Sequence, residues 1–163
     1  PAEFAKWVQR QKADAAPVVD GSPADKGKAL FAAKSCVMCH NVGGHFGAGA
    51  FGPDLTHVAS RKSLAGAWLD NRDLAAQRAL ERKNENTESS VAVDPAKLKA
   101  NLIKWIGSSG TSHDANGKPT KDVKPGNRMH YYKMFNVAGL RETNQTFTAE
   151  ELDYLAEYLL TLK

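Results

Sequence analysis

Apolar residues recur at intervals of three and four along most of the chain, as they do on the buried face of a helix. No stretch alternates apolar and polar residues in the way that a half-buried strand would. The spacing predicts helices over residues 1–11, 22–35, 61–83, 94–107 and 148–163. The hydrophobic pattern therefore predicts an all-α fold.

Two of these helices carry clear start signals. Ser22 can cap the first turn of the second helix, where Pro23 fits the backbone and Asp25 completes a capping-box pattern. Thr148 and Glu151 repeat that pattern before the last helix. We therefore expect these two helices to begin where the capping residues stand.

The segments between the helices are rich in glycine, proline and polar residues. They cover residues 13–21, 43–52, 84–90 and 108–126. Such composition is typical of turns and surface loops. The first of these segments is expected to be a linker between the N-terminal helix and the rest of the chain.

Length and charge narrow the class of protein. The chain has 163 residues, a formal charge of +4 and 42% hydrophobic residues, which fits one domain with a short extension. No apolar run approaches the length that a bilayer requires. The positive charge favours an acidic partner, and no nucleic-acid-binding motif is present. Because the sequence starts at Pro1 without a methionine, we expect a processed or excised piece of a longer chain.

The most specific chemical signal is the run Cys36–His40, which reads C-V-M-C-H. C-x-x-C-H is the attachment motif of a c-type haem. On one helical turn the two thiols face the same way and can add to the two vinyl groups of a porphyrin. The histidine is then carried under the ring, where it can bind the iron as proximal ligand. Because this haem is attached outside the cytoplasm, the motif also predicts a periplasmic or equivalent location.

Other interpretations of the motif are weaker. A thioredoxin-like C-x-x-C needs a surrounding βαβ pattern, which the sequence lacks. A disulfide between Cys36 and Cys39 would close almost no loop and so would constrain little. The chain has two cysteines in all, so no second pair could complete a zinc site. We therefore expect haem c as a covalently attached cofactor.

The ligand on the other face of the iron decides the function. A thioether raises the reduction potential and closes the iron to substrates, which gives an electron carrier. A second histidine would lower the potential, and an open position would allow peroxide or gas chemistry. The candidates are Met129, Met134, His45, His57, His113 and His130.

Met129 is the favoured ligand because it ends the run K-P-G-N-R-M, in which proline and glycine give a stiff loop. Met134 lies in the apolar run 131–135, where core packing is the more natural role. Met134 and His130, the immediate neighbour of Met129, stay as alternatives.

Several separated motifs occur in the order typical of class I cytochromes c. They are G-K-A-L-F at 27–31, C-V-M-C-H at 36–40, G-P-D-L at 52–55, the helix of Trp105, K-P-G-N-R-M at 124–129 and the helix of Tyr158. The chain resembles that class over residues 22–163. More narrowly, the run F-G-P-D-L-T-H-V-A-S-R at 51–61 resembles the haem c domain of subunit II of caa3-type cytochrome c oxidases.

The resemblance implies the class I cytochrome c fold, in which helices and loops wrap around one haem c. Residues 1–21 would then form a helix and linker that join an upstream CuA domain. The cytochrome c domain would span residues 22–163, with inserted loops near 70–100 and 107–124. The family usually has proline after the ligand methionine, and here His130 stands in that place.

The resemblance also assigns the residues of the site. The haem-binding residues would be Cys36, Cys39, Pro53, Arg61, Trp105 and Asn127, and the iron ligands would be His40 and Met129. The carbonyl of Pro53 would accept the proton of the proximal imidazole and so fix its orientation. Arg61 and Trp105 would lie near the haem propionates.

A helix crossing is implied as well. Gly27, Phe31 and Tyr158 would form the contact between the first and last helices of the domain, where only glycine allows close approach.

The function that follows is one-electron transfer through a His/Met-ligated haem c. In the oxidase interpretation the electron comes from a quinol-oxidising complex or a small cytochrome and goes to the CuA centre of the same subunit. The membrane would be reached only through an upstream anchor. Two alternatives remain: a free-standing soluble cytochrome c, and a haem enzyme or gas sensor with an open sixth position.

Overall fold

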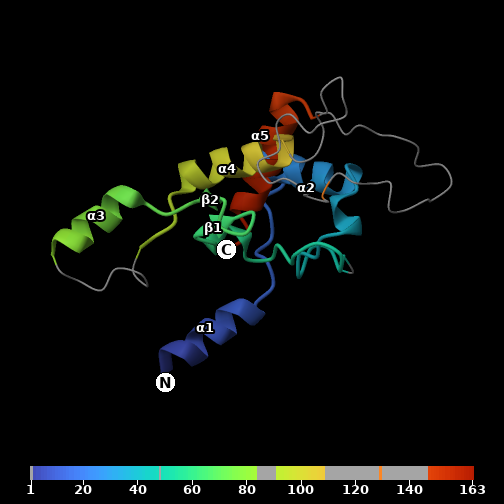
Figure 1. Ribbon diagram of the computed structural model, residues 1–163. Coiled ribbons are helices and arrows are strands. Elements are labelled where there is room, and N and C mark those ends of the chain that lie inside the picture. The colour runs from blue at the N-terminus through green and yellow to red at the C-terminus, as the bar shows by residue number, and fades with distance from the viewer. Residues whose placement is uncertain (1, 48, 84–90, 109–128, 130–146) are drawn as a thin grey trace. The chain divides into compact units, whose positions relative to one another are not determined.

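The computed structural model describes residues 2–47, 49–83, 91–108, 129 and 147–163 (Figure 1). The chain divides into two compact units. The first contains Pro1–Arg61 and Tyr154–Lys163, and the second contains Lys62–Asp153.

The described residues are mostly helical, as the hydrophobic pattern predicts. The helices are α1 (Ala2–Lys12), α2 (Pro23–Ala33), α3 (Leu74–Arg82), α4 (Pro95–Ser108) and α5 (Ala149–Leu160). Two short 3₁₀ turns lie at Cys36–Met38 and Val58–Ser60, and two strands, β1 (Ser63–Leu64) and β2 (Leu69–Asp70), pair antiparallel. None of the helices in the described part of the chain is long and apolar enough to cross a membrane.

Capping by side chains sets where α2 and α5 begin. Ser22 Oγ accepts a hydrogen bond from the Asp25 backbone N–H at 3.2 Å, and Thr148 Oγ1 accepts one from that of Glu151 at 3.1 Å. In return, a Glu151 carboxylate oxygen accepts a hydrogen bond from the Thr148 N–H at 2.9 Å. Both predicted helix starts are confirmed.

In the first unit, α2 packs against the part of α5 that begins at Tyr154. A Cβ atom on Gly27 would overlap the carbonyl oxygen of Tyr154, so the two backbones meet where α2 has no side chain. The rings of Phe31 and Tyr158 lie edge to face beside this point, with centroids 5.5 Å apart. The crossing of Gly27, Phe31 and Tyr158 that the sequence predicts is confirmed. Its neighbours complete a buried core of Val42, Val58, Ala59, Leu155, Ala156, Leu159 and Leu162.

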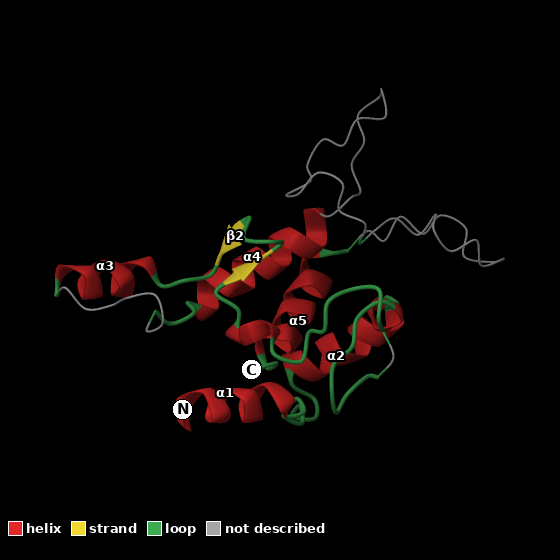
Figure 2. Ribbon diagram, turned by 60° about the horizontal axis from the view of Figure 1, so that its bottom comes forward, coloured by secondary structure: helices red, strands yellow, loops and turns green. Residues whose placement is uncertain are grey.

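In the second unit, the β1–β2 hairpin lies against α4 (Figure 2). The side-chain amide of Asn101, on α4, donates to the carbonyl of Asp70 at 2.9 Å and to Asn71 Oδ1 at 2.7 Å. Asn71 is fully buried, so the second of these bonds satisfies its side-chain oxygen inside the unit.

The helix predicted over residues 61–83 is wrong in its first half. Residues 65–67 all have φ values between 57° and 70°, which reverse the chain between β1 and β2. Leu64 and Leu69 face the interior across this turn, whereas Trp68 is 59% exposed. Leu64 and Trp68, four residues apart, therefore do not share a buried helical face. The helix is confined to α3, where Asp73 Oδ1 caps the first turn.

Candidate functional site

The C-V-M-C-H motif lies directly after α2, on a single 3₁₀ turn that begins at Cys36. The backbone N–H groups of Cys39 and His40 both donate to the Cys36 carbonyl, at 3.2 and 3.0 Å. In a 3₁₀ turn residues three apart lie one above the other, so the two cysteines share a face. They form no disulfide, and burial raises the pKa of the Cys36 thiol to about 11. The motif thus presents two thiols on one turn.

The imidazole of His40 is held by the backbone of residues 49–53. Its Nδ1 lies 2.8 Å from the carbonyl oxygen of Pro53. Because a carbonyl only accepts, Nδ1 carries the proton and Nε2 remains as the base that can bind a metal. A Cβ atom on Gly52 would lie 2.5 Å from His40 Cε1, and one on Gly49 would overlap the His40 backbone. The glycine-rich loop therefore wraps closely around this histidine.

The donor set fits haem c. Two thiols on one turn match the two vinyl groups, and the imidazole that follows has the tautomer that leaves Nε2 for iron. Among the described residues, no group of three or more cysteine, histidine or acidic side chains could bind a metal ion.

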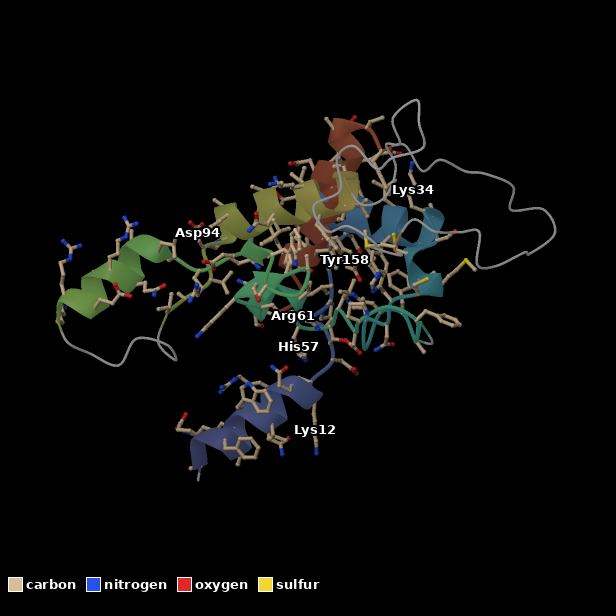
Figure 3. The ribbon with its side chains drawn as sticks, viewed as in Figure 1. Lys12, Lys34, His57, Arg61, Asp94 and Tyr158 are labelled. Atoms are coloured by element: carbon tan, nitrogen blue, oxygen red, sulfur yellow. The ribbon has the colours of Figure 1, made fainter. Side chains whose placement is uncertain are left out.

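Arg61 lies in the same unit, within reach of the segment that holds His40. Its Nη2 donates to the carbonyl oxygen of Asp54 at 2.6 Å. Together with Lys12 and His57, it lines a polar cavity of about 520 Å³ (Figure 3). Asn41 and Asp54 line this cavity too, so it borders the residues that follow His40 and Pro53.

Two of the histidines considered as second ligands are hydrogen-bonded through Nδ1 within the first unit. His45 Nδ1 is hydrogen-bonded to the Tyr158 hydroxyl at 3.0 Å, and the two rings stack with centroids 5.8 Å apart. His57 Nδ1 lies 2.8 Å from the carbonyl oxygen of Lys163 and so donates to it. Both contacts anchor the loops that follow the motif to the C-terminal part of the chain.

The environment of His45 predicts a pH effect on stability. Burial, and then the positive charge of Lys28, lower the pKa of His45 below its ordinary value of 6.5. Below that pH the unfolded chain binds the proton more readily than the folded one, so the free energy of unfolding falls as the pH falls. Denaturant unfolding between about pH 5 and pH 8 measures this slope. The His45→Gln variant, which cannot titrate, should show a flatter profile; an unchanged slope would contradict the assignment.

The remaining predicted site residues belong to the second unit or lie outside the described residues. Trp105 is half-buried on α4, and Met129 is half-buried in a turn. Asn127 lies outside the described residues, as do Met134, His113, His130 and residues 109–124 of the predicted loop near 107–124. Residues 107 and 108 of that loop are the last residues of α4. The proximity of Trp105, Asn127 and Met129 to the haem stays a prediction.

The sequence interpretation did not assign roles to Asn41, Asp54 or Thr56. The side-chain amide of Asn41 donates to Asp54 Oδ2, and the Thr56 N–H donates to Asp54 Oδ1 at 2.8 Å. Thr56 Oγ1 in turn accepts from the Gly43 N–H at 2.8 Å. The sequence feature that could have pointed to these hydrogen bonds is the position of Asp54, directly after Pro53 in the G-P-D-L run.

Comparison with known proteins finds a match to one family over most of the chain. The sequence model of the family described as cytochrome c matches residues 24–163. No match was found among curated proteins or among solved structures. The matched range includes the motif, both helices of the Gly27 crossing and the segment that holds His40.

Proposed function

The chain belongs to the cytochrome c family, and from that premise we propose that it relays single electrons to the CuA centre of a membrane-bound terminal oxidase. The family carries covalently attached haem c, so this chain is a haem c protein that transfers electrons. The mostly helical structure with its small two-stranded sheet fits the class I cytochrome c fold.

In this proposal Cys36 and Cys39 form the thioethers, and His40 is the proximal ligand. The observation that carries it is the 2.8 Å contact between His40 Nδ1 and the Pro53 carbonyl. That contact fixes the imidazole plane, keeps the proton on Nδ1 and raises the basicity of Nε2. The bound haem supplies an iron that alternates between the ferrous and ferric states.

Met129 is the proposed second ligand. A thioether on the other face closes the iron to external ligands and favours the ferrous state. The protein would then take part in outer-sphere transfer, in which no ligand is exchanged. Arg61 and Trp105 are proposed to lie near the haem propionates, and Asn127 to support the haem from the loop that ends at Met129.

The oxidase as partner is supported by the resemblance of residues 51–61 to subunit II domains. In that setting the chain follows a CuA domain and an anchor, faces the periplasm or its equivalent, and receives electrons from a quinol-oxidising complex or a small cytochrome. A free-standing soluble carrier has the same haem chemistry but lacks the copper domain.

The full-length gene product separates these two settings. The oxidase proposal predicts that the purified protein contains copper as well as haem iron. After rapid reduction of the haem, stopped-flow spectroscopy should show the electron passing to CuA within the same molecule, at a rate independent of protein concentration. A full-length product without copper or a membrane anchor would contradict the oxidase assignment and leave the soluble carrier.

A further inference from the structure

Asp54 accepts several hydrogen bonds. It directly follows Pro53, whose carbonyl contacts His40. Its two carboxylate oxygens accept from the Asn41 side-chain amide and from the Thr56 N–H, the latter at 2.8 Å. Its own carbonyl oxygen accepts from Arg61 Nη2 at 2.6 Å. Both the side chain and the backbone of Asp54 are therefore held.

Hydrogen bonds join residues 39–41, which include His40, to residues 52–55, which include Pro53. The Gly52 N–H donates to the Cys39 carbonyl at 2.8 Å, and the Leu55 N–H donates to the Asn41 carbonyl at 2.9 Å. The His40–Pro53 contact lies between these two backbone bonds. The side-chain bond from Asn41 to Asp54 joins the residue after His40 to the residue after Pro53, so it fastens the contact on one side.

The carboxylate of Asp54 is suited to this position because it is held in the charged form. Partial burial alone would raise its pKa, but hydrogen bonds from Thr56 and Asn41 and the charge of Arg61 outweigh that effect and lower the pKa below its usual value. Hydrogen bonds to a charged acceptor are stronger than those between neutral groups. The bond from Asn41 is therefore present at neutral pH.

We propose that Asp54 and Asn41 are positioning residues for the proximal ligand: their side-chain bond holds the Pro53 carbonyl against His40 Nδ1 and so controls the orientation and basicity of the imidazole. This inference rests on the proposed role of His40 as an iron ligand. Outer-shell partners of this kind tune a metal through the ligand that they orient.

The proposal predicts that Asp54→Ala loosens the His40–Pro53 contact. Exchange of the His40 Nδ1 proton with solvent, measured by NMR on the reduced haem protein, should become about tenfold faster. The reduction potential should rise, because a less basic imidazole and the loss of a nearby negative charge both disfavour ferric iron. Asp14→Asn is the matched control: Asp14 lines the same cavity, and the described residues show no hydrogen bond from it to residues 52–56.

A charge swap separates positioning from a general loss of stability. Asn41→Asp alone places two carboxylates face to face, so the side-chain bond is lost. Asp54→Asn alone can keep the bond, because its oxygen accepts from the Thr56 N–H while its amide donates to the side-chain oxygen of Asn41 once the Asn41 amide turns over. Combined, they restore both bonds, since the new amide donates to the new carboxylate and still accepts from Thr56. The Asn41→Asp variant should speed the exchange of the Nδ1 proton, and the addition of Asp54→Asn should return it to within about twofold of wild type.

Failure of the positioning role and failure of the proposed function give different results. If the His40 ring of wild type shows no haem-induced NMR shift, His40 is not a ligand and the proposed function itself fails. If the ring is shifted but neither Asp54→Ala nor Asn41→Asp changes Nδ1 exchange or the potential, the positioning role is overturned. A lower unfolding midpoint with unchanged exchange would also overturn it, because that is the signature of a purely structural contact.

Discussion

Replacing Met129 with alanine is expected to open the iron to external ligands and to lower the reduction potential by on the order of 0.1 V or more. A thioether favours the ferrous state and occupies the sixth position, whereas alanine leaves that position open. Carbon monoxide should therefore bind the reduced variant rapidly and the reduced wild type slowly. Stopped-flow mixing measures the binding rates, and a redox titration measures the potential.

Met134→Ala is the matched control, because it removes a thioether only five residues away. It should keep both the closed site and the wild-type potential. Rapid binding of carbon monoxide to the reduced wild type would contradict a closed electron carrier and favour a haem enzyme or gas sensor. If Met134→Ala opens the iron and Met129→Ala does not, the ligand assignment is wrong.

Replacing Gly27 with alanine is expected to destabilise the first unit by about 3 kcal/mol. In an ordinary helix this change would stabilise by about 1 kcal/mol, because alanine has the higher helix propensity. Here the added Cβ would overlap the Tyr154 carbonyl oxygen and lie 2.8 Å from Tyr158 Cβ, so α2 and α5 must separate. Denaturant unfolding of the haem protein measures the loss.

Gly47→Ala is the control for the Gly27 variant. A Cβ atom at Gly47 meets nothing within 4 Å, so its free energy of unfolding should stay within about 0.5 kcal/mol of wild type. A Gly27→Ala variant that matches wild type, or is more stable, would contradict the close helix crossing.

The helices that could be predicted from sequence are those whose boundaries depend on neighbouring residues. The capping pairs of α2 and α5 act over three residues, so they could be recognised without knowledge of the tertiary structure. The hairpin at 63–70 could not be recognised in this way. Its turn places Ala65 and Ala67 at positive φ, a conformation that alanine rarely adopts, so local propensity pointed to a helix.

The candidate site shows the same division between local and distant contacts. The two thiols and the imidazole of the motif are specified by spacing on one turn, and the Pro53 contact was accessible through the family resemblance. The bond between Asn41 and Asp54 joins residues 13 apart across a loop, and no periodicity or capping pattern encodes it. This bond could be identified only from the backbone path of the glycine-rich loop at residues 43–52.

We propose that Met129 and His40 hold the haem iron in a closed electron carrier. NMR of the reduced protein, with its three methionines labelled at the methyl carbon, tests this directly. A methionine bound to the iron lies over the porphyrin, whose ring current shifts its methyl signal strongly upfield. We expect one such signal in wild type, which is lost in Met129→Ala and kept in Met134→Ala. No upfield-shifted methyl signal in wild type, or its loss in Met134→Ala alone, would contradict Met129 as the second ligand.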